Sequence, residues 1–168
     1  MEVPRLMPNW SEVERQAPEL GARVRGRFEA HGLGMLATLR KDGAPRISGI
    51  EVLFDSGELW LGMMPDSLKA KDLIRDPRFA LHSATTDKQV AEGDAKIAGL
   101  AVPVEDESTI EGFRLAVAAR TGYPPPPGPM RLFTLDVAEL SILKPGGPDF
   151  LNLDAWHAGR GETHTELR

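Results

Sequence analysis

The side chains best suited to hold an anion lie in residues 59–73, LWLGMMPDSLKAKDL. The first half alternates its side chains with period two, which predicts a strand that ends at Pro65. Asp66 or Ser67 can then cap a helix whose first turn contains Lys69. Free backbone N–H groups, the positive end of the helix dipole and the lysine charge would together favour a phosphate group there. On these residues alone, a capped helix beside a solvated lysine is the simpler interpretation.

The composition is that of one ordinary globular domain. With 168 residues, 41% hydrophobic and 27% charged, the chain is long enough to bury a core without cross-links. Its net charge of −5 argues against nucleic acid or an anionic membrane as a general partner. The absence of cysteine excludes disulfides, thiolate metal sites and thiol nucleophiles. The sequence begins without a basic segment followed by an apolar run and has no long apolar stretch, so we expect a cytoplasmic protein.

We expect a single domain over residues 1–168, made of an N-terminal helical part (1–32), a barrel with inserted helices (33–156) and a polar tail (157–168). Residues 11–14, SEVE, match a capping box and predict helix to about His31, with a kink or break at Pro18. The tail is mostly polar and is expected to be mobile.

Period-two alternation predicts six or seven strands, at residues 33–40, 46–54, 59–64, 78–83, 94–104, 130–144 with a bend, and 150–156. Asp42-Gly43 is a hairpin signal between the first two strands. The sequence PGGP at 145–148 is expected to end the pairing of the sixth. Most connections are too short for parallel crossovers, so we predict an antiparallel barrel with appended helices.

Two helices are expected between these strands. The first should run from Ser67 to just before Pro77, because the residue before a proline avoids the helical region. A second capping box at residues 108–111, STIE, predicts another helix that ends near Gly122. The prolines at 124–127 then predict a stiff, extended connector.

Residues 43–81, GAPRISGIEVLFDSGELWLGMMPDSLKAKDLIRDPRFAL, resemble the pyridoxamine 5′-phosphate oxidase-like superfamily of FMN-binding split β-barrels. The shared features are a strand that opens with arginine, a D/E-x-G turn, an apolar strand and a Ser-x-Lys helix start. GDAKIAGLAV at 93–102 extends the similarity. The resemblance implies a mostly β fold, a six- to seven-stranded antiparallel split barrel, and a homodimer whose cofactor cleft lies between the subunits.

The same resemblance implies a phosphate site. Arg46, Ser67 and Lys69 match the residues that hold the FMN phosphate in family members, and Leu68 stands between the serine and the lysine. Two cations and the amides of a helix start suit a dianionic phosphate.

A ring site is implied beside it. By similarity, Thr38, Ile47 and Ser48 would lie near the flavin ring, through backbone groups as much as side chains, and Met63 would border the ring.

Several positions differ from pyridoxamine 5′-phosphate oxidase itself. Glu51 replaces a lysine, Met63 a threonine and Leu68 an arginine, and Asp94 aligns loosely with a flavin-contacting glutamine. The C-terminal Arg-x-His signature for pyridoxal phosphate is also missing. We therefore expect that the protein does not oxidise pyridoxamine phosphate.

No other pattern predicts a reaction. The histidines His31, His82, His157 and His164 form no H-x-x-x-H pair or compact cluster with carboxylates, so we expect no metal site. There is no G-x-S-x-G nucleophile and no side chain that stands out as a general acid or base. The catalytic residues stay unassigned, as suits direct hydride transfer to or from a flavin.

The leading hypothesis is an FMN-dependent oxidoreductase that acts on a small molecule. The alternatives are a reductase that uses the deazaflavin coenzyme F420 and a non-catalytic barrel that binds flavin or haem. Glu51 and Met63 favour the non-catalytic alternative, because they remove two cofactor contacts of the pyridoxamine oxidase pattern.

Overall fold

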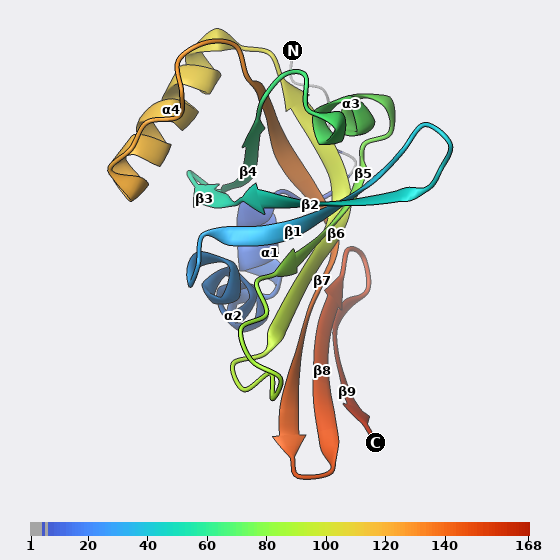
Figure 1. Ribbon diagram of the computed structural model, residues 1–168. Helices are drawn as coiled ribbons and strands as arrows, with labels where there is room; N and C mark the ends of the chain where they lie inside the picture. The colour runs from blue at the N-terminus through green and yellow to red at the C-terminus, as the bar shows by residue number, and fades with distance from the viewer. Residues whose placement is uncertain (1–4, 6) are drawn as a thin grey trace.

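The computed structural model describes residue 5 and residues 7–168 (Figure 1). In this part of the chain the helices are α1 (Trp10–Gln16), α2 (Pro18–Glu29), α3 (Leu68–Arg75) and α4 (Glu107–Thr121). The strands are β1 (Leu33–Leu39), β2 (Pro45–Glu51), β3 (Leu53–Asp55), β4 (Glu58–Met63), β5 (Arg78–Ser83), β6 (Asp94–Val104), β7 (Arg131–Gly147), β8 (Phe150–His157) and β9 (Gly161–Leu167).

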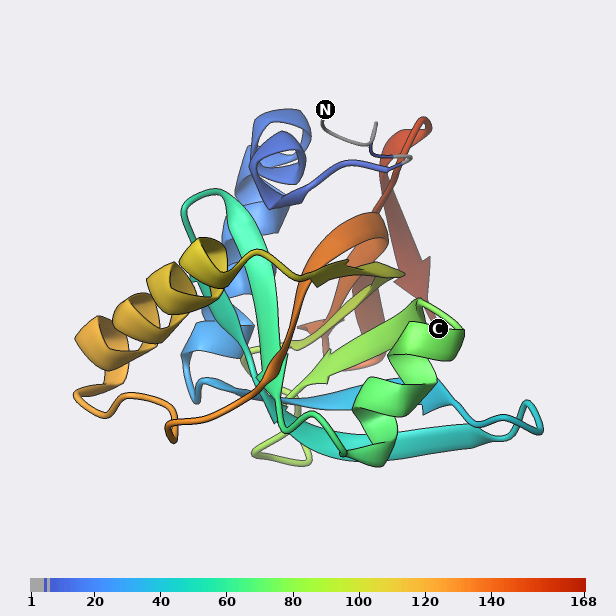
Figure 2. The same ribbon diagram turned by 90° about the horizontal axis from the view of Figure 1, so that it is seen from above.

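The strands form one antiparallel sheet that curls on itself. The paired order is β2-β1-β5-β6-β7-β4-β3, with β8 and β9 added beyond β7. Only Val52 separates β2 from β3, although these strands end opposite sides of the paired path. The sheet must therefore bend until its two edges meet without pairing, as Figures 1 and 2 show. The predicted class, an antiparallel split barrel with appended helices, is confirmed.

The helices close the barrel at different places. Trp10 of α1 is fully buried and packs edge-on against Phe54, with ring centroids 4.7 Å apart. Phe28 of α2 lies 6.3 Å from the same ring, so both N-terminal helices cover the core beside β3. At the opposite side, α3 lies against the β1-β2 hairpin. The helix α4 projects from the body (Figures 1 and 2), and near its end Arg120 contacts Glu29 of α2 and the carbonyl oxygen of Phe54.

Both predicted capping boxes are displaced by two residues. Asn9, not Ser11, caps α1: its side chain accepts the amide of Glu12, and the Glu12 carboxylate accepts the amide of Asn9, both at 3.0 Å. Asp106, in place of Ser108, caps α4 through the amide of Thr109 at 2.8 Å. In each case an Asx side chain just ahead of the serine takes the amide first, and the serine hydroxyl donates to that side chain.

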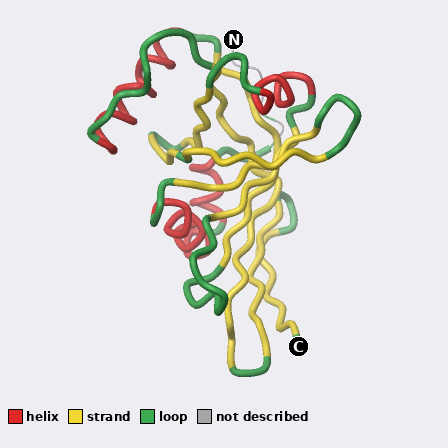
Figure 3. The backbone as a smooth tube through the Cα atoms, in the orientation of Figure 1, coloured by secondary structure: helices red, strands yellow, loops and turns green. Residues whose placement is uncertain are grey.

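The C-terminal predictions need two corrections. The PGGP segment does not end pairing, because β7 continues to Gly147 with Pro145 opposite Leu151. The expected mobile tail is wrong as well, because residues 161–167 form β9 and pair along β8 (Figure 3). Thr163 and Thr165 are β-branched and suit a strand, while Gly159 adopts the positive φ that the preceding turn requires. Together with the separate β3, β9 raises the count to nine strands in the described residues, not six or seven.

Two features that the described residues lack set limits on the site. No helix there has the length and apolar character needed to cross a bilayer. The same residues contain no group of three or more histidine or carboxylate side chains placed to hold a metal ion.

Candidate functional site

A cavity of about 340 Å³ lies where the edge strand β2 meets the start of α3. We call it the anion cradle; its lining residues are Arg40, Arg46, Ile47, Ser48, Ser67, Leu68 and Lys69. All but Arg40 were singled out from the sequence. The fold therefore brings six of the eight predicted site residues to one place, from two segments about twenty residues apart.

The helix start supplies donors to this cavity. The Ser67 side chain accepts the amide of Ala70 at 3.4 Å and so caps α3. No acidic residue occupies the first turn of α3, and Lys69 stands there instead. A cation at a helix N-terminus is unfavourable by roughly 0.3–1 kcal/mol, because it faces the positive end of the dipole. Such an arrangement costs stability unless an anion is bound, so it favours an anion site.

Lys69 also links α3 to the edge strand. Its ammonium group donates to the carbonyl oxygen of Gly49 on β2 at 2.8 Å. An ammonium group has three protons, so this bond leaves two for a ligand. The lysine is thus held over the cradle and keeps donors for an anion.

Arg46 is fixed by a buried carboxylate. Its Nε atom donates to Asp72 of α3 at 2.6 Å, and Asp72 is only 3% exposed. The buried Thr38 hydroxyl donates to the same carboxylate at 2.9 Å, and Arg75 donates to its other oxygen at 2.9 Å. Among the described residues the terminal nitrogens of Arg46 have no partner, so they remain free to hold a ligand oxygen pair.

These contacts determine the charge of Asp72. Burial alone would raise the pKa of Asp72, but the hydrogen bonds from Arg46, Arg75 and Thr38 outweigh it and hold the pKa below its ordinary value of 3.8. The carboxylate is therefore ionised at neutral pH. It orients Arg46 and neutralises part of the cationic charge that gathers around the cradle.

The cradle nevertheless has an excess of positive charge. Arg40, Arg46 and Lys69 line it, and within the described residues no carboxylate does. Arg40 follows β1 and lies beside the Asp42-Gly43 turn, where its backbone N–H donates to the carbonyl oxygen of Ala44. This turn places Arg40 at the cradle. Three cations around a helix start form a donor set for a dianionic phosphate.

The remaining predicted residues lie elsewhere. Thr38 is 2% exposed and supports the cradle from behind through Asp72. Met63 is 6% exposed, belongs to the main core cluster and does not line the cradle, so its predicted place at the ring gains no support. Glu51 is exposed at the far end of β2, opposite Leu33, and does not enter the cradle.

Sequence reasoning missed two residues. Alternation predicts only a strand position for Arg40, although a hairpin register extended from Asp42-Gly43 places it near Arg46. Asp72 had no signal of its own, because its role depends on how α3 packs against β1 and β2.

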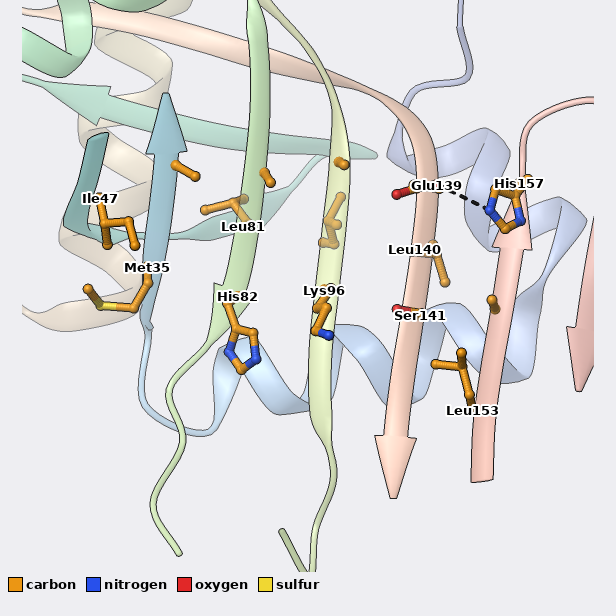
Figure 4. Close-up of a pocket in the computed structure, with 15 residues that line it drawn as sticks. Met35, Ile47, Leu81, His82, Lys96, Glu139, Leu140, Ser141, Leu153 and His157 are labelled. Atoms are coloured by element: carbon orange, nitrogen blue, oxygen red, sulfur yellow. Dashed lines mark ion pairs between the residues drawn. The ribbon is translucent and has the colours of Figure 1, made fainter. Parts of the chain in front are cut away.

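A second cavity of about 370 Å³ lies on the outer face of β1, β5, β6, β7 and β8 (Figure 4). We call it the trough. Its lining is mostly apolar, and His82, Lys96, Ser141, Glu139 and His157 are its polar side chains. Ile47 lines both cavities, so the trough and the anion cradle meet at the edge strand β2.

Comparison with known proteins agrees with this fold. Residues 20–144 match the family model of pyridoxamine 5′-phosphate oxidase, which is most of the chain. The protein belongs to the pyridoxamine 5′-phosphate oxidase-like superfamily.

Three solved structures show how varied proteins with this fold are. A pyridoxamine 5′-phosphate oxidase-related, FMN-binding protein from Nostoc punctiforme is 17% identical, with a TM-score of 0.63 over 88% of this chain and 94% of its own. A haem-binding protein from Mycobacterium smegmatis is 17% identical, with a TM-score of 0.57 and 87% of each chain covered. An F420 reductase is 21% identical, with a TM-score of 0.51 over 65% of this chain and 88% of its own. At these identities the likeness is one of fold alone.

We predict that Asp72→Asn lowers the free energy of unfolding at neutral pH by about 2 kcal/mol, because hydrogen bonds to a buried charge are lost. A carboxyl group whose folded pKa is depressed stabilises the fold above its unfolded pKa, and this stability is lost as the pH falls toward the folded pKa. The difference between wild type and variant should therefore narrow below about pH 4. Urea unfolding of both proteins at a series of pH values measures this difference in the free energy of unfolding.

Asp66→Asn is the matched control, because the Asp66 side chain is 96% exposed and lies 3.8 Å from its lysine partner. It should change stability little at any pH. A stability difference for Asp72→Asn that stays constant from neutral to acidic pH would contradict the assigned charge.

Proposed function

We propose that this protein is an FMN-binding oxidoreductase that transfers hydride between the flavin and a small-molecule substrate. We also propose that it is not a pyridoxamine phosphate oxidase, since Glu51, Met63 and Leu68 replace polar residues of that enzyme's pattern.

One observation supports the proposal above all others. The residues that match the family's phosphate-binding positions, Arg46, Ser67 and Lys69, line a single cavity at the start of α3. Their hydrogen bonds leave donors for a ligand. Arg46 uses only its Nε to bind Asp72, and Lys69 uses one ammonium proton to bind the carbonyl oxygen of Gly49. The donor set fits a dianionic phosphate and offers no ligands for a metal ion.

The edge strand favours a flat cofactor ring beyond the phosphate. Within the described residues β2 is the first strand of the paired order, so one of its sides presents backbone N–H and C=O groups without strand partners there. Ile47 and Ser48 on this strand line the cradle, and Ile47 also lines the trough. A ligand anchored by its phosphate could thus extend along β2 toward the outer face.

These residues indicate which tasks belong to a bound flavin and which to the protein. A bound flavin supplies the hydride chemistry, and the protein binds, orients and shields it. Arg46 and Lys69 would hold the phosphate, Ser67 would fix the helix start, and the apolar lining of the trough would exclude water from the reacting face.

A homodimer is the second part of the proposal. Met35 and Ile47 are 45% and 70% exposed on the outer face, beside the trough. Large exposed apolar side chains next to a mostly apolar cavity are typical of a buried interface. A second subunit on this face would cover the trough and form a cleft between subunits.

Lys69→Ala should weaken FMN binding by about 10- to 100-fold, because a charge-assisted hydrogen bond to phosphate is lost. Riboflavin lacks the phosphate, so its affinity should be weaker in the wild type and unchanged by the substitution. Fluorescence quenching of each flavin on titration with the protein measures all four constants.

Lys71→Ala is the control for this experiment. Lys71 lies on the same helix but is 58% exposed and does not line the cradle. It should leave FMN affinity unchanged. Equal FMN affinity for Lys69→Ala and wild type would refute the phosphate assignment. Tighter binding of coenzyme F420 or haem than of FMN would identify that molecule as the cofactor instead.

Sedimentation equilibrium should show a dimer, and Ile47→Asp should dissociate it, because a charge would be buried in the apolar interface. Leu115→Asp on α4 is the control, since Leu115 is 64% exposed and does not line the trough. A monomeric wild type would contradict the proposed cleft.

A further inference from the structure

Three alanines form a recessed floor in the trough. Ala37 lies opposite Ala80, and Ala80 lies opposite Ala98, so the three occupy one register across β1, β5 and β6. Their chain neighbours Leu36 and Leu81 are buried, so the alanines face outward. Alanine is depleted in strands, and three adjacent alanines leave a flat, shallow strip where larger side chains would project.

A row of three polar side chains, His82, Lys96 and Ser141, borders this floor, with the apolar Met35 at one end. The row lies two residues from the alanine on each of the strands β1, β5 and β6. In it Met35 pairs with His82, His82 with Lys96, and Lys96 with Ser141 on β7. Neighbouring strands are about 4.8 Å apart, so these side chains stand next to one another on four strands. Figure 4 shows Met35, His82 and Lys96 side by side along this row.

Lys96 is the unmatched charge of the row. In the described part of the chain no hydrogen bond or ion pair engages its ammonium group, and it stands at the rim of a mostly apolar cavity. The carboxylates nearest to it in register have other partners. Glu139 lies 3.1 Å from His157, and Asp94 accepts the Thr85 hydroxyl at 3.1 Å and lies 3.8 Å from Nε2 of His82.

Ser141 and His82 complete the edge. Ser141 adds a hydroxyl donor beside Lys96. The His82 ring is held by a contact of 2.7 Å between its Nδ1 and the carbonyl oxygen of Ser83, which fixes a flat surface next to the alanine floor. A flat apolar strip with a lysine and a hydroxyl along one edge suits a planar molecule that carries one negative charge at its end.

We propose that the trough binds a flat, unsaturated carboxylate, with its conjugated part on Ala37, Ala80 and Ala98 and its carboxylate on Lys96 and Ser141. The cavity volume of about 370 Å³ falls at the small end of the range for small-molecule sites. Calling this ligand the substrate rests on the proposed function, because the trough joins the anion cradle at Ile47. The binding itself does not depend on a flavin.

The test uses trans-cinnamate as the probe and its neutral amide, cinnamamide, as the uncharged match. In the full-length protein with alanine methyl groups labelled with ¹³C, cinnamate should shift the methyl signals of Ala37, Ala80 and Ala98. The methyl signal of Ala118, on α4, should not move. Isothermal titration should give a dissociation constant for cinnamate at least about tenfold below that for cinnamamide, as expected for one charge-assisted contact.

Lys96→Met keeps an unbranched side chain of similar length and removes its charge. It should weaken cinnamate binding to the level of cinnamamide and leave cinnamamide unaffected. Lys144→Met is the matched control: Lys144 is exposed on the same strand as Ser141, but an odd number of residues away and thus on the other face. It should bind cinnamate like the wild type.

Ala80→Leu provides an independent check, because it raises the floor at an exposed position and should abolish binding of both probes. Equal affinities for cinnamate and cinnamamide, or shifts confined to other alanines, would overturn the inference.

The titrations are repeated with FMN present. Cinnamate binding to a protein that fails to take up FMN would sustain the trough and refute the proposed cofactor, whereas FMN uptake without cinnamate binding would refute the trough alone.

Discussion

The buried carboxylate of Asp72 is the contact on which the geometry of the site depends. It accepts hydrogen bonds from Thr38 on β1, Arg46 on β2 and Arg75 on α3, and so ties two strands and a helix to one point. A buried charge is tolerated only when it is paired and hydrogen-bonded, so these elements cannot shift independently without a large cost. The position of Arg46, and with it the shape of the anion cradle, is a consequence of that constraint.

The edge of the split barrel explains why both cavities occur together. β2 begins the paired order, and the chain leaves it through Val52 to start β3 at the other end of that order. The open seam keeps β2 accessible from both faces. Arg46 and Ser48 belong to the side that meets α3, whereas Ile47 reaches the outer face and the trough. A closed barrel would have paired this strand and removed the meeting point.

Much of this arrangement could be predicted because it depends on local chemistry. Ser67, one of the two predicted cap residues, caps α3, and the Asp42-Gly43 turn set the β1-β2 register that lines the cradle. The errors arose where two local signals competed or where packing decided. Asn9 displaced Ser11 as a cap, and residues 161–167 form a strand because β8 offers them a partner.

In the site, too, some residues could be predicted from the sequence and others depend on packing. Arg46, Ser67 and Lys69 were predicted from their resemblance to the phosphate-binding positions of the superfamily, and the fold brings them together. Asp72 could not be found, because its importance comes from three contacts between elements distant in sequence. Met63 was expected near the ring, but strand alternation puts it on the core face of β4, where apolar contacts already account for it.

The central claim is that the anion cradle holds the phosphate of a flavin. The most direct test is the visible absorption spectrum of the protein purified from its natural host, with the ligand released by heat and identified by mass. We expect an oxidised flavin spectrum and the mass of FMN. A protein that is colourless as isolated and takes up neither FMN, coenzyme F420 nor haem on titration would contradict the claim, and the cradle would then be an anion site without a redox cofactor.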